Sequence, residues 1–177
     1  MPIKPVSDWS SSYEDIFYKN VTVDTQPMLW GKWVDQNTQG LSAASPYNIA
    51  TVTLNRASFP PVTAPPAPTP APFCSLLANA WFAYIGSAIW APCPPIPPFS
   101  AIASVTPSMV GIAAAQASLM ASLIAAMTPP SMPDKVRAMQ ISTAFYTATL
   151  ASGIMISGTS LPSPTPIPLV LPLMPVM

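Results

Sequence analysis

Few residues of this chain are of the types that carry out chemistry. The sequence contains no histidine, so the commonest general base and metal ligand is absent. Glu14 and Asp15 are adjacent acids, but neighbours on a helix point about 100° apart and do not converge on one substrate. Asp134, Lys135 and Arg137 form the other charged group, and their spacing is typical of a solvated helix start. We therefore expect no enzymatic activity, no cofactor and no bound metal.

The two cysteines are also poor candidates for chemistry. If residues 73–90 form one helix, the Cα atoms of Cys74 and Cys93 are about 25 Å apart, at about 1.5 Å per residue. A disulfide needs less than about 7 Å between the two Cα atoms. Each cysteine is therefore expected to be a small buried apolar side chain.

The charges of the chain are few and unevenly placed. Charged residues make up 7% of the sequence, against about 25% in typical soluble domains, and half of the residues are apolar. All of the charges except Asp134, Lys135 and Arg137 lie in the first 56 residues. The formal net charge is zero, so no nucleic-acid partner is indicated. The long uncharged tracts must be buried against protein or lipid, because disordered chains combine low hydrophobicity with high charge.

The 26 prolines divide the chain into regions. The composition predicts a mixed amphipathic N-terminal region (1–56), a polyproline linker (57–72), an apolar helical region (73–158) and an extended proline-rich tail (159–177). In the first region, the spacing of the aromatic residues indicates a short helix capped by Ser10, Ser11 or Ser12, and the alternation at 47–54 indicates a strand. The predicted fold class is mainly α with long irregular, proline-rich extended segments, short Ala- and Met-rich helices and a non-globular, arm-like architecture.

Three helices are predicted after the linker. The first covers Phe73 to Trp90, and the second begins with Thr106 as cap and Pro107 at its first position and ends at Met127. The third begins at Ser131–Asp134, a capping-box spacing with Asp in place of Glu, and ends near Ser152. Two heptad-like stripes follow from the spacing of side chains on these helices. They are Met109, Ile112, Gln116, Leu119, Leu123 and Ala126 on the second helix, and Val136, Met139, Thr143, Tyr146 and Leu150 on the third.

The expected functional residues are contacts within an assembly. The opposite face of the second helix carries Ala114, Ala117, Ala121 and Ala125, so this helix is predicted to be packed on both sides. Trp30 and Trp33 flank Gly31-Lys32, which fits either an anchoring contact or a small local aromatic cluster. The residues expected to contact neighbouring subunits are Trp30, Trp33, Trp81, Phe82, Trp90, Met109, Ile112, Gln116, Leu119, Leu123, Phe145 and Tyr146.

From residue 73 onward the chain resembles small structural proteins of contractile-tailed bacteriophages. The resemblance rests on the aromatic helix around Trp81, Phe82 and Trp90, on Val105-Thr106-Pro107 opening an Ala-rich helix, on Ile141 to Tyr146, on Gly158-Thr159, and on Pro164 to Pro168. It covers about 60% of the chain and contains no diagnostic motif. It implies a virion protein of the tail or baseplate that associates with other structural subunits, with self-association as one option, and it carries over no catalytic residue.

An integral membrane protein is the alternative. Segments 73–91, 108–127 and 138–157 each have about 20 residues without charge, the length that a bilayer core requires. Against this alternative, the second segment is rich in alanine instead of leucine, and the third contains several hydroxyl groups. The short connections also lack the Lys/Arg asymmetry that orients membrane proteins.

Overall fold

A computed structural model describes residues 3–19, 26–39, 41–44, 49–63, 70–92, 102–160 and 166–172. The structure is mainly helical, as the sequence predicts. Its helices are α1 (Val6–Glu14), α2 (Gln26–Thr38), α3 (Pro70–Gly86), α4 (Ile112–Met127) and α5 (Asp134–Ala151). A π-helical turn η1 (Asp15–Lys19) continues α1, and a three-residue 3-10 helix η3 (Arg56–Ser58) precedes α3.

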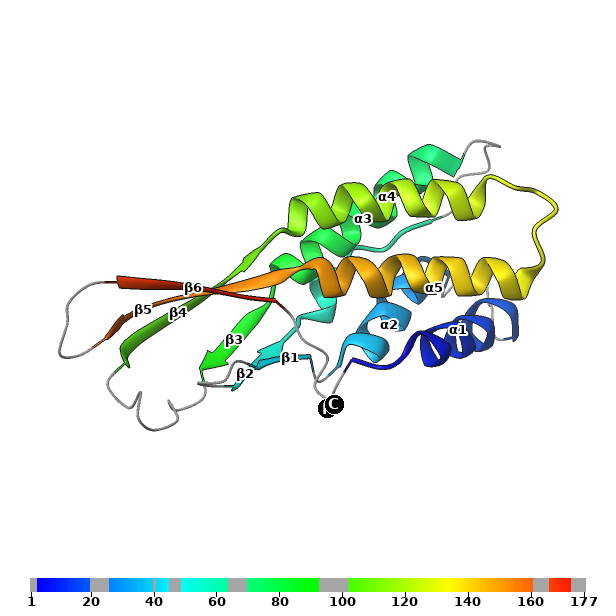
Figure 1. The fold of residues 1–177 in the computed structure, drawn as a ribbon. Helices are drawn as coiled ribbons and strands as arrows, with labels where there is room; N and C mark the ends of the chain where they lie inside the picture. The colour runs from blue at the N-terminus through cyan, green and yellow to red at the C-terminus, as the bar shows by residue number, and fades with distance from the viewer. Residues whose placement is uncertain are drawn as a thin grey trace.

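The strands form two antiparallel three-stranded sheets. In the first, β2 (Ile49–Thr53) lies between β1 (Ser42–Ala44) and β3 (Ile89–Pro92). In the second, β5 (Gly153–Ser160) lies between β4 (Ile102–Val110) and β6 (Pro166–Pro172). Figure 1 shows the five helices gathered at one end of the molecule, while the β4–β5–β6 sheet extends away from them.

The helices enclose one contiguous apolar core. It includes Trp9 of α1, Trp33 of α2, Trp81 of α3, Leu123 of α4 and Phe145 of α5, all of them at most 1% exposed. The N-terminal region and the apolar helical region therefore share one core, whereas the expected non-globular architecture had none. The reason is the aromatic content of α1 and α2, whose large apolar rings pack directly on α5.

The proline-rich connection contributes to this core at its beginning. Phe59 and Val62 are each 5% exposed, and the Val62 backbone N–H donates to the Pro27 carbonyl at 2.9 Å. The end of the connection, Pro70 to Pro72, is the first turn of α3, where no backbone N–H is needed. Residues 64–69 of the predicted linker lie outside the described residues.

Some helix and strand boundaries differ from the prediction. Residues 102–110, which include the predicted cap Thr106, form strand β4 along β5, and α4 begins after Gly111 at φ 76°. The first apolar helix ends at Gly86, so that Trp90 lies in β3. Helix α1 follows Pro5, and Ser10 to Ser12 lie within it instead of capping it.

The third apolar helix has nearly the predicted bounds, and the strand predicted at 47–54 is present as β2. The capping box proposed for α5 is wrong. Pro133 occupies the cap position, and no side chain makes a capping hydrogen bond there. The predicted extended tail includes β5 residues and β6, which is paired along its length with β5.

Candidate functional site

Six of the predicted contact residues are buried inside their own chain. Relative exposure is 6% for Trp30 and at most 1% for the other members of this set, which are Trp33, Trp81, Leu119, Leu123 and Phe145. Their apolar surface is already removed from water by intramolecular packing. In the folded chain these side chains do not reach a neighbouring subunit, and their role is to hold the helices together.

Trp30 and Trp33 belong to an aromatic cluster that joins distant parts of the sequence. The Trp33 ring meets Trp9 edge-on at a centroid distance of 5.3 Å and Phe145 at 5.2 Å. Its indole N–H donates to the Trp9 carbonyl at 3.0 Å, so the polar end of this buried ring is satisfied. The sequence left open an anchoring contact or a small local aromatic cluster, and the geometry is that of an aromatic cluster. The cluster is not local, because it spans α1, α2 and α5.

The remaining predicted contacts have mixed positions. Ile112 and Tyr146 are partly buried against the core, and the Gln116 side chain donates to Asn79 Oδ1 of α3 at 2.6 Å. Phe82 is 38% exposed, which leaves its ring open to a neighbour. Trp90 and Met109 lie in β3 and β4, where the structure describes the backbone and not these side chains.

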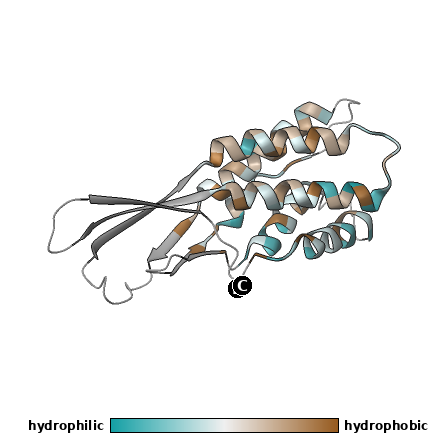
Figure 2. Ribbon diagram, in the orientation of Figure 1, coloured by the Kyte–Doolittle hydropathy of each residue, from teal (hydrophilic) through white to brown (hydrophobic). Residues whose placement is uncertain are grey.

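The stripe predicted on α4 is confirmed from Ile112 onward. Leu119, Leu123 and Ala126 are buried, and the helix packs against α3 and α5 of the same chain. The opposite face is exposed, and it consists of Ala113, Ala114, Ala117, Ser118, Met120, Ala121, Ser122 and Ala125. Figure 2 shows α4 in pale to brown colours over most of its length, whereas α1 carries more teal.

The stripe predicted on α5 is wrong. Val136 is 45% exposed and Met139 is 44% exposed, while Ala138, Ile141 and Phe145 are buried. The packed face of α5 is therefore rotated from the predicted one. The prediction considered only the spacing of apolar residues along α5. In the structure α1 packs on another face of α5, and the sequence of α5 alone does not identify that face.

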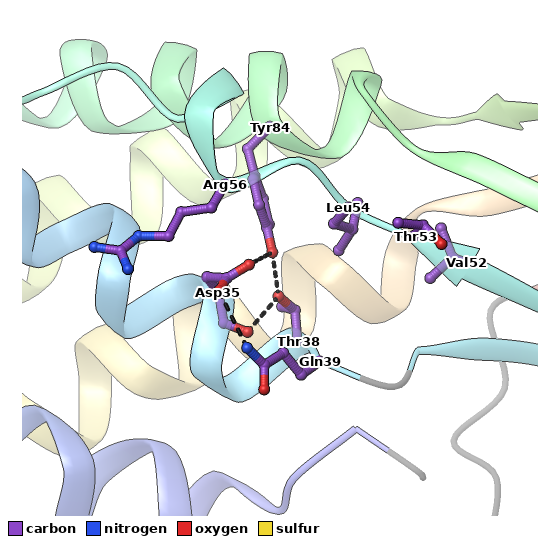
Figure 3. Close-up of a pocket in the computed structure, with 8 residues that line it drawn as sticks. All are labelled: Asp35, Thr38, Gln39, Val52, Thr53, Leu54, Arg56 and Tyr84. Atoms are coloured by element: carbon purple, nitrogen blue, oxygen red, sulfur yellow. Dashed lines mark hydrogen bonds between the residues drawn. The ribbon is translucent and has the colours of Figure 1, made fainter.

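A polar pocket lies between α2, α3 and β2 (Figure 3). Its volume is about 320 Å³, and its polar lining residues include Asp35, Thr38, Gln39, Arg56 and Tyr84. The Tyr84 hydroxyl donates to Asp35 Oδ1 at 3.0 Å and lies 2.7 Å from Thr38 Oγ1. The Gln39 amide donates to Asp35 Oδ2 at 3.2 Å. Both carboxylate oxygens of Asp35 are thus held in place.

Burial is the main cause that raises the pKa of Tyr84 above its ordinary value, and the nearby Asp35 carboxylate adds to it. The phenol is therefore neutral at physiological pH and acts as a hydrogen-bond donor. A neutral phenol beside a held carboxylate can bind a cation or a hydrogen-bond donor. In the described part of the chain, no three His, Cys, Asp or Glu side chains lie together in a way that could hold a metal.

The sequence did not point to this pocket. Asp35, Thr38 and Gln39 are spaced three and four residues apart, which places them on one face of a helix. That signal becomes readable only once residues 26–38 are recognised as a helix, and no helix was predicted there. Tyr84 and Arg56 come from distant segments, so nothing in their local sequence connects them with Asp35.

Cys74 has the surroundings expected from the sequence. Its thiol is free and buried, and its Sγ donates to Met127 Sδ at 3.6 Å. Burial raises the pKa of the thiol, so the reactive thiolate form is disfavoured. Cys93 lies outside the described residues.

The chain matches no protein-family model, no curated protein and no solved structure. Among the helices of the described residues, none combines the length and the apolar character needed to cross a membrane.

Proposed function

We propose that the protein is a structural component of a large protein assembly, a virion tail or baseplate in the reading that the sequence resemblance favours. One observation carries the proposal, namely the exposed face of α4. This face runs along most of the helix, and its exposed side chains are alanines and serines together with Met120, without a single charge.

Such a face is unusual on a protein that remains alone in water. Soluble surfaces carry about 25–35% charged side chains, which keep molecules apart. Here residues 57–133 carry none. Met120, Val136 and Met139 add apolar surface on α4 and α5, with relative exposures of 38%, 45% and 44%. Small side chains also allow another backbone to approach closely, so the face suits a packed subunit contact.

The β4–β5–β6 sheet supports the same role as an extended arm. It projects from the helices in Figure 1, and its central strand β5 is paired over most of its length with β4 on one side and β6 on the other. An arm of this kind reaches a neighbouring subunit beyond the helices. The proposed arrangement therefore has two elements of attachment, the uncharged α4 face and the sheet.

Ala117→Asp tests the proposal. Ala117 is exposed, so the variant is expected to keep the thermal midpoint of the isolated chain within a few degrees, yet to be excluded from the assembly. An unpaired carboxylate in a closed contact costs several kcal/mol. Ser11→Asp is the control, because Ser11 is exposed on α1 among residues that are already charged.

The measurement is the amount of each tagged variant in particles purified on a density gradient without detergent. Wild-type protein and Ser11→Asp are expected in the particle fraction, and Ala117→Asp is expected to be depleted from it. Equal incorporation of all three proteins would contradict a role for the α4 face. A wild-type protein found only in membranes and released only by detergent would favour the membrane alternative.

A further inference from the structure

Two opposite charges line the polar pocket without pairing with each other. Figure 3 shows the Arg56 guanidinium directed away from the Asp35 carboxylate, although both residues line the same hollow. Among the described residues the ion pair present is between Lys19 and Asp15, so within this part of the chain Asp35 and Arg56 have no charged partner. The chain has only six acidic and six basic residues, so these two neighbouring charges are notable. Each can pair with an opposite charge on a partner molecule.

The Asp35 carboxylate is prepared for a cation. Tyr84 donates a hydrogen bond to Oδ1 of Asp35, and Gln39 donates one to Oδ2. These two bonds fix the orientation of the carboxylate before any partner binds. The side chain is only half buried, so its remaining acceptor positions face the hollow. A guanidinium group satisfies a carboxylate best, because its planar fork donates two parallel hydrogen bonds.

The Arg56 side chain projects into solvent beside this hollow. Its side chain is exposed, and it also lines a second, mostly apolar hollow of about 440 Å³ formed with Met28, Phe59 and Pro60. Arg56 therefore stands between a polar hollow and an apolar one. Met28 is 54% exposed there and supplies apolar surface without a partner in the chain.

From this arrangement we propose that a second copy of the chain docks on this surface about a two-fold axis. The Arg56 side chain of each copy enters the polar pocket of the other and pairs with its Asp35. A two-fold contact is self-complementary, so one cation and one adjacent acid form two reciprocal pairs. The two apolar hollows, with Met28, contribute the additional buried area, since stable interfaces bury more than about 1,000 Å² in total.

This inference extends the proposed structural role, because it names the chain itself as one of the subunit partners. The proposed dimer contact does not involve the exposed face of α4, which lies on a different helix from Asp35 and Arg56. The two proposals can therefore fail separately. A chain that dimerises through Arg56 but enters no particle would overturn the proposed function and leave the dimer in place.

The experiment is sedimentation equilibrium of the full chain over a range of concentrations. Arg56→Glu is expected to weaken self-association by at least about tenfold, because it sets two acids opposite each other at both reciprocal contacts. Lys135→Glu, an equal change of charge at an exposed α5 position outside both hollows, is the matched control and is expected to have an effect below about twofold. Circular dichroism checks that both variants remain folded.

Mixing two variants provides the sharper test. Asp35→Lys alone and Arg56→Glu alone are each expected to be mainly monomeric, whereas an equimolar mixture regains both complementary pairs and forms a heterodimer. Should Asp35→Lys fold poorly, Asp35→Asn replaces it, keeps an acceptor for Tyr84 and is expected to weaken association on its own. A monomeric wild-type chain at millimolar concentration, or equal effects of Arg56→Glu and Lys135→Glu, would overturn the proposal. If free arginine or another small cation bound at Asp35 without any dimer, the pocket would be a ligand site and not a subunit contact.

Discussion

Replacing Phe145 by alanine tests whether the aromatic N-terminal region and the apolar helices form one folding unit. Phe145 is fully buried in α5, with its ring 5.2 Å from Trp33 and 6.2 Å from Trp30. Deleting a buried phenylalanine ring costs about 3–5 kcal/mol, through lost burial and the cavity left behind. The total stability of a domain is about 5–15 kcal/mol, so Phe145→Ala is expected to remove a large share of it.

The assay is urea unfolding followed by two signals on the same samples. Tryptophan fluorescence is weighted toward the N-terminal region, which contains Trp9, Trp30 and Trp33, while far-ultraviolet circular dichroism is dominated by α3, α4 and α5. In a single cooperative unit both transitions shift together to lower urea. Met139→Ala on the same helix is the control; its side chain is 44% exposed, and its effect is expected within about 0.5 kcal/mol.

Two results would refute this reasoning. A fluorescence transition that stays in place while the dichroism transition moves would show that the N-terminal region folds separately, as the proline-rich connection suggested from the sequence alone. A loss of stability below about 1 kcal/mol would show that the Phe145 site collapses around the missing ring.

Three further variants and conditions follow from the described contacts. Gly111→Ala is expected to destabilise the chain by about 1–2 kcal/mol in urea unfolding, because Gly111 has φ 76° and an alanine there is strained. Tyr84→Phe removes the donor to Asp35 and is expected to cost about 0.5–1.5 kcal/mol in the same assay, and an unchanged midpoint would argue against this hydrogen bond. Burial raises the pKa of both Tyr13 and Tyr84, so the stabilising effect of their neutral form is complete below the ordinary tyrosine pKa of about 10 and is lost as the pH rises above it. Thermal midpoints measured from pH 8 to pH 11 check this, and a flat profile would contradict it.

The sequence predicted the parts of the fold that depend on local signals. Prolines before residue 134 and the break after Ala151 delimit α5, and the spacing of Leu119, Leu123 and Ala126 identifies the buried face of α4. In each case, the information lies within one turn or one stripe of the element. These are the features for which helix-stopping residues and periodicity are sufficient.

The missed features depend on partners far away in the chain. Val105 and Thr106 favour a strand, but what makes residues 102–110 a strand is their pairing with β5, about fifty residues later. The buried face of α5 is decided by α1 and α4 together, and the polar pocket by segments around Asp35, Arg56 and Tyr84. Local periodicity contains none of these pairings, so the pocket could not have been assembled from the sequence.

The prolines of β6 allow one inference about the edge of the β4–β5–β6 sheet. Pro166, Pro168 and Pro172 occupy alternate positions, opposite Thr159, Ser157 and Gly153 of β5. Backbone N–H groups of alternate residues point to the same side of a strand, and proline has none. The β6 strand therefore keeps its N–H donors toward β5 only if the nitrogens of the prolines lie on the side of the strand away from β5.

This arrangement predicts that the β6 prolines protect the sheet from edge-to-edge pairing. Along Pro166–Pro172 they leave Val170 as the one residue with an outward N–H, so an added strand would find few donors. Pro166→Thr combined with Pro168→Thr is expected to preserve the helical dichroism but to increase light scattering on incubation, because threonine restores two donors and favours strands. Pro130→Thr, an exposed proline in the α4–α5 connection, is the control and is expected to scatter like wild type. Equal scattering from all three proteins would mean that the prolines do not close this edge.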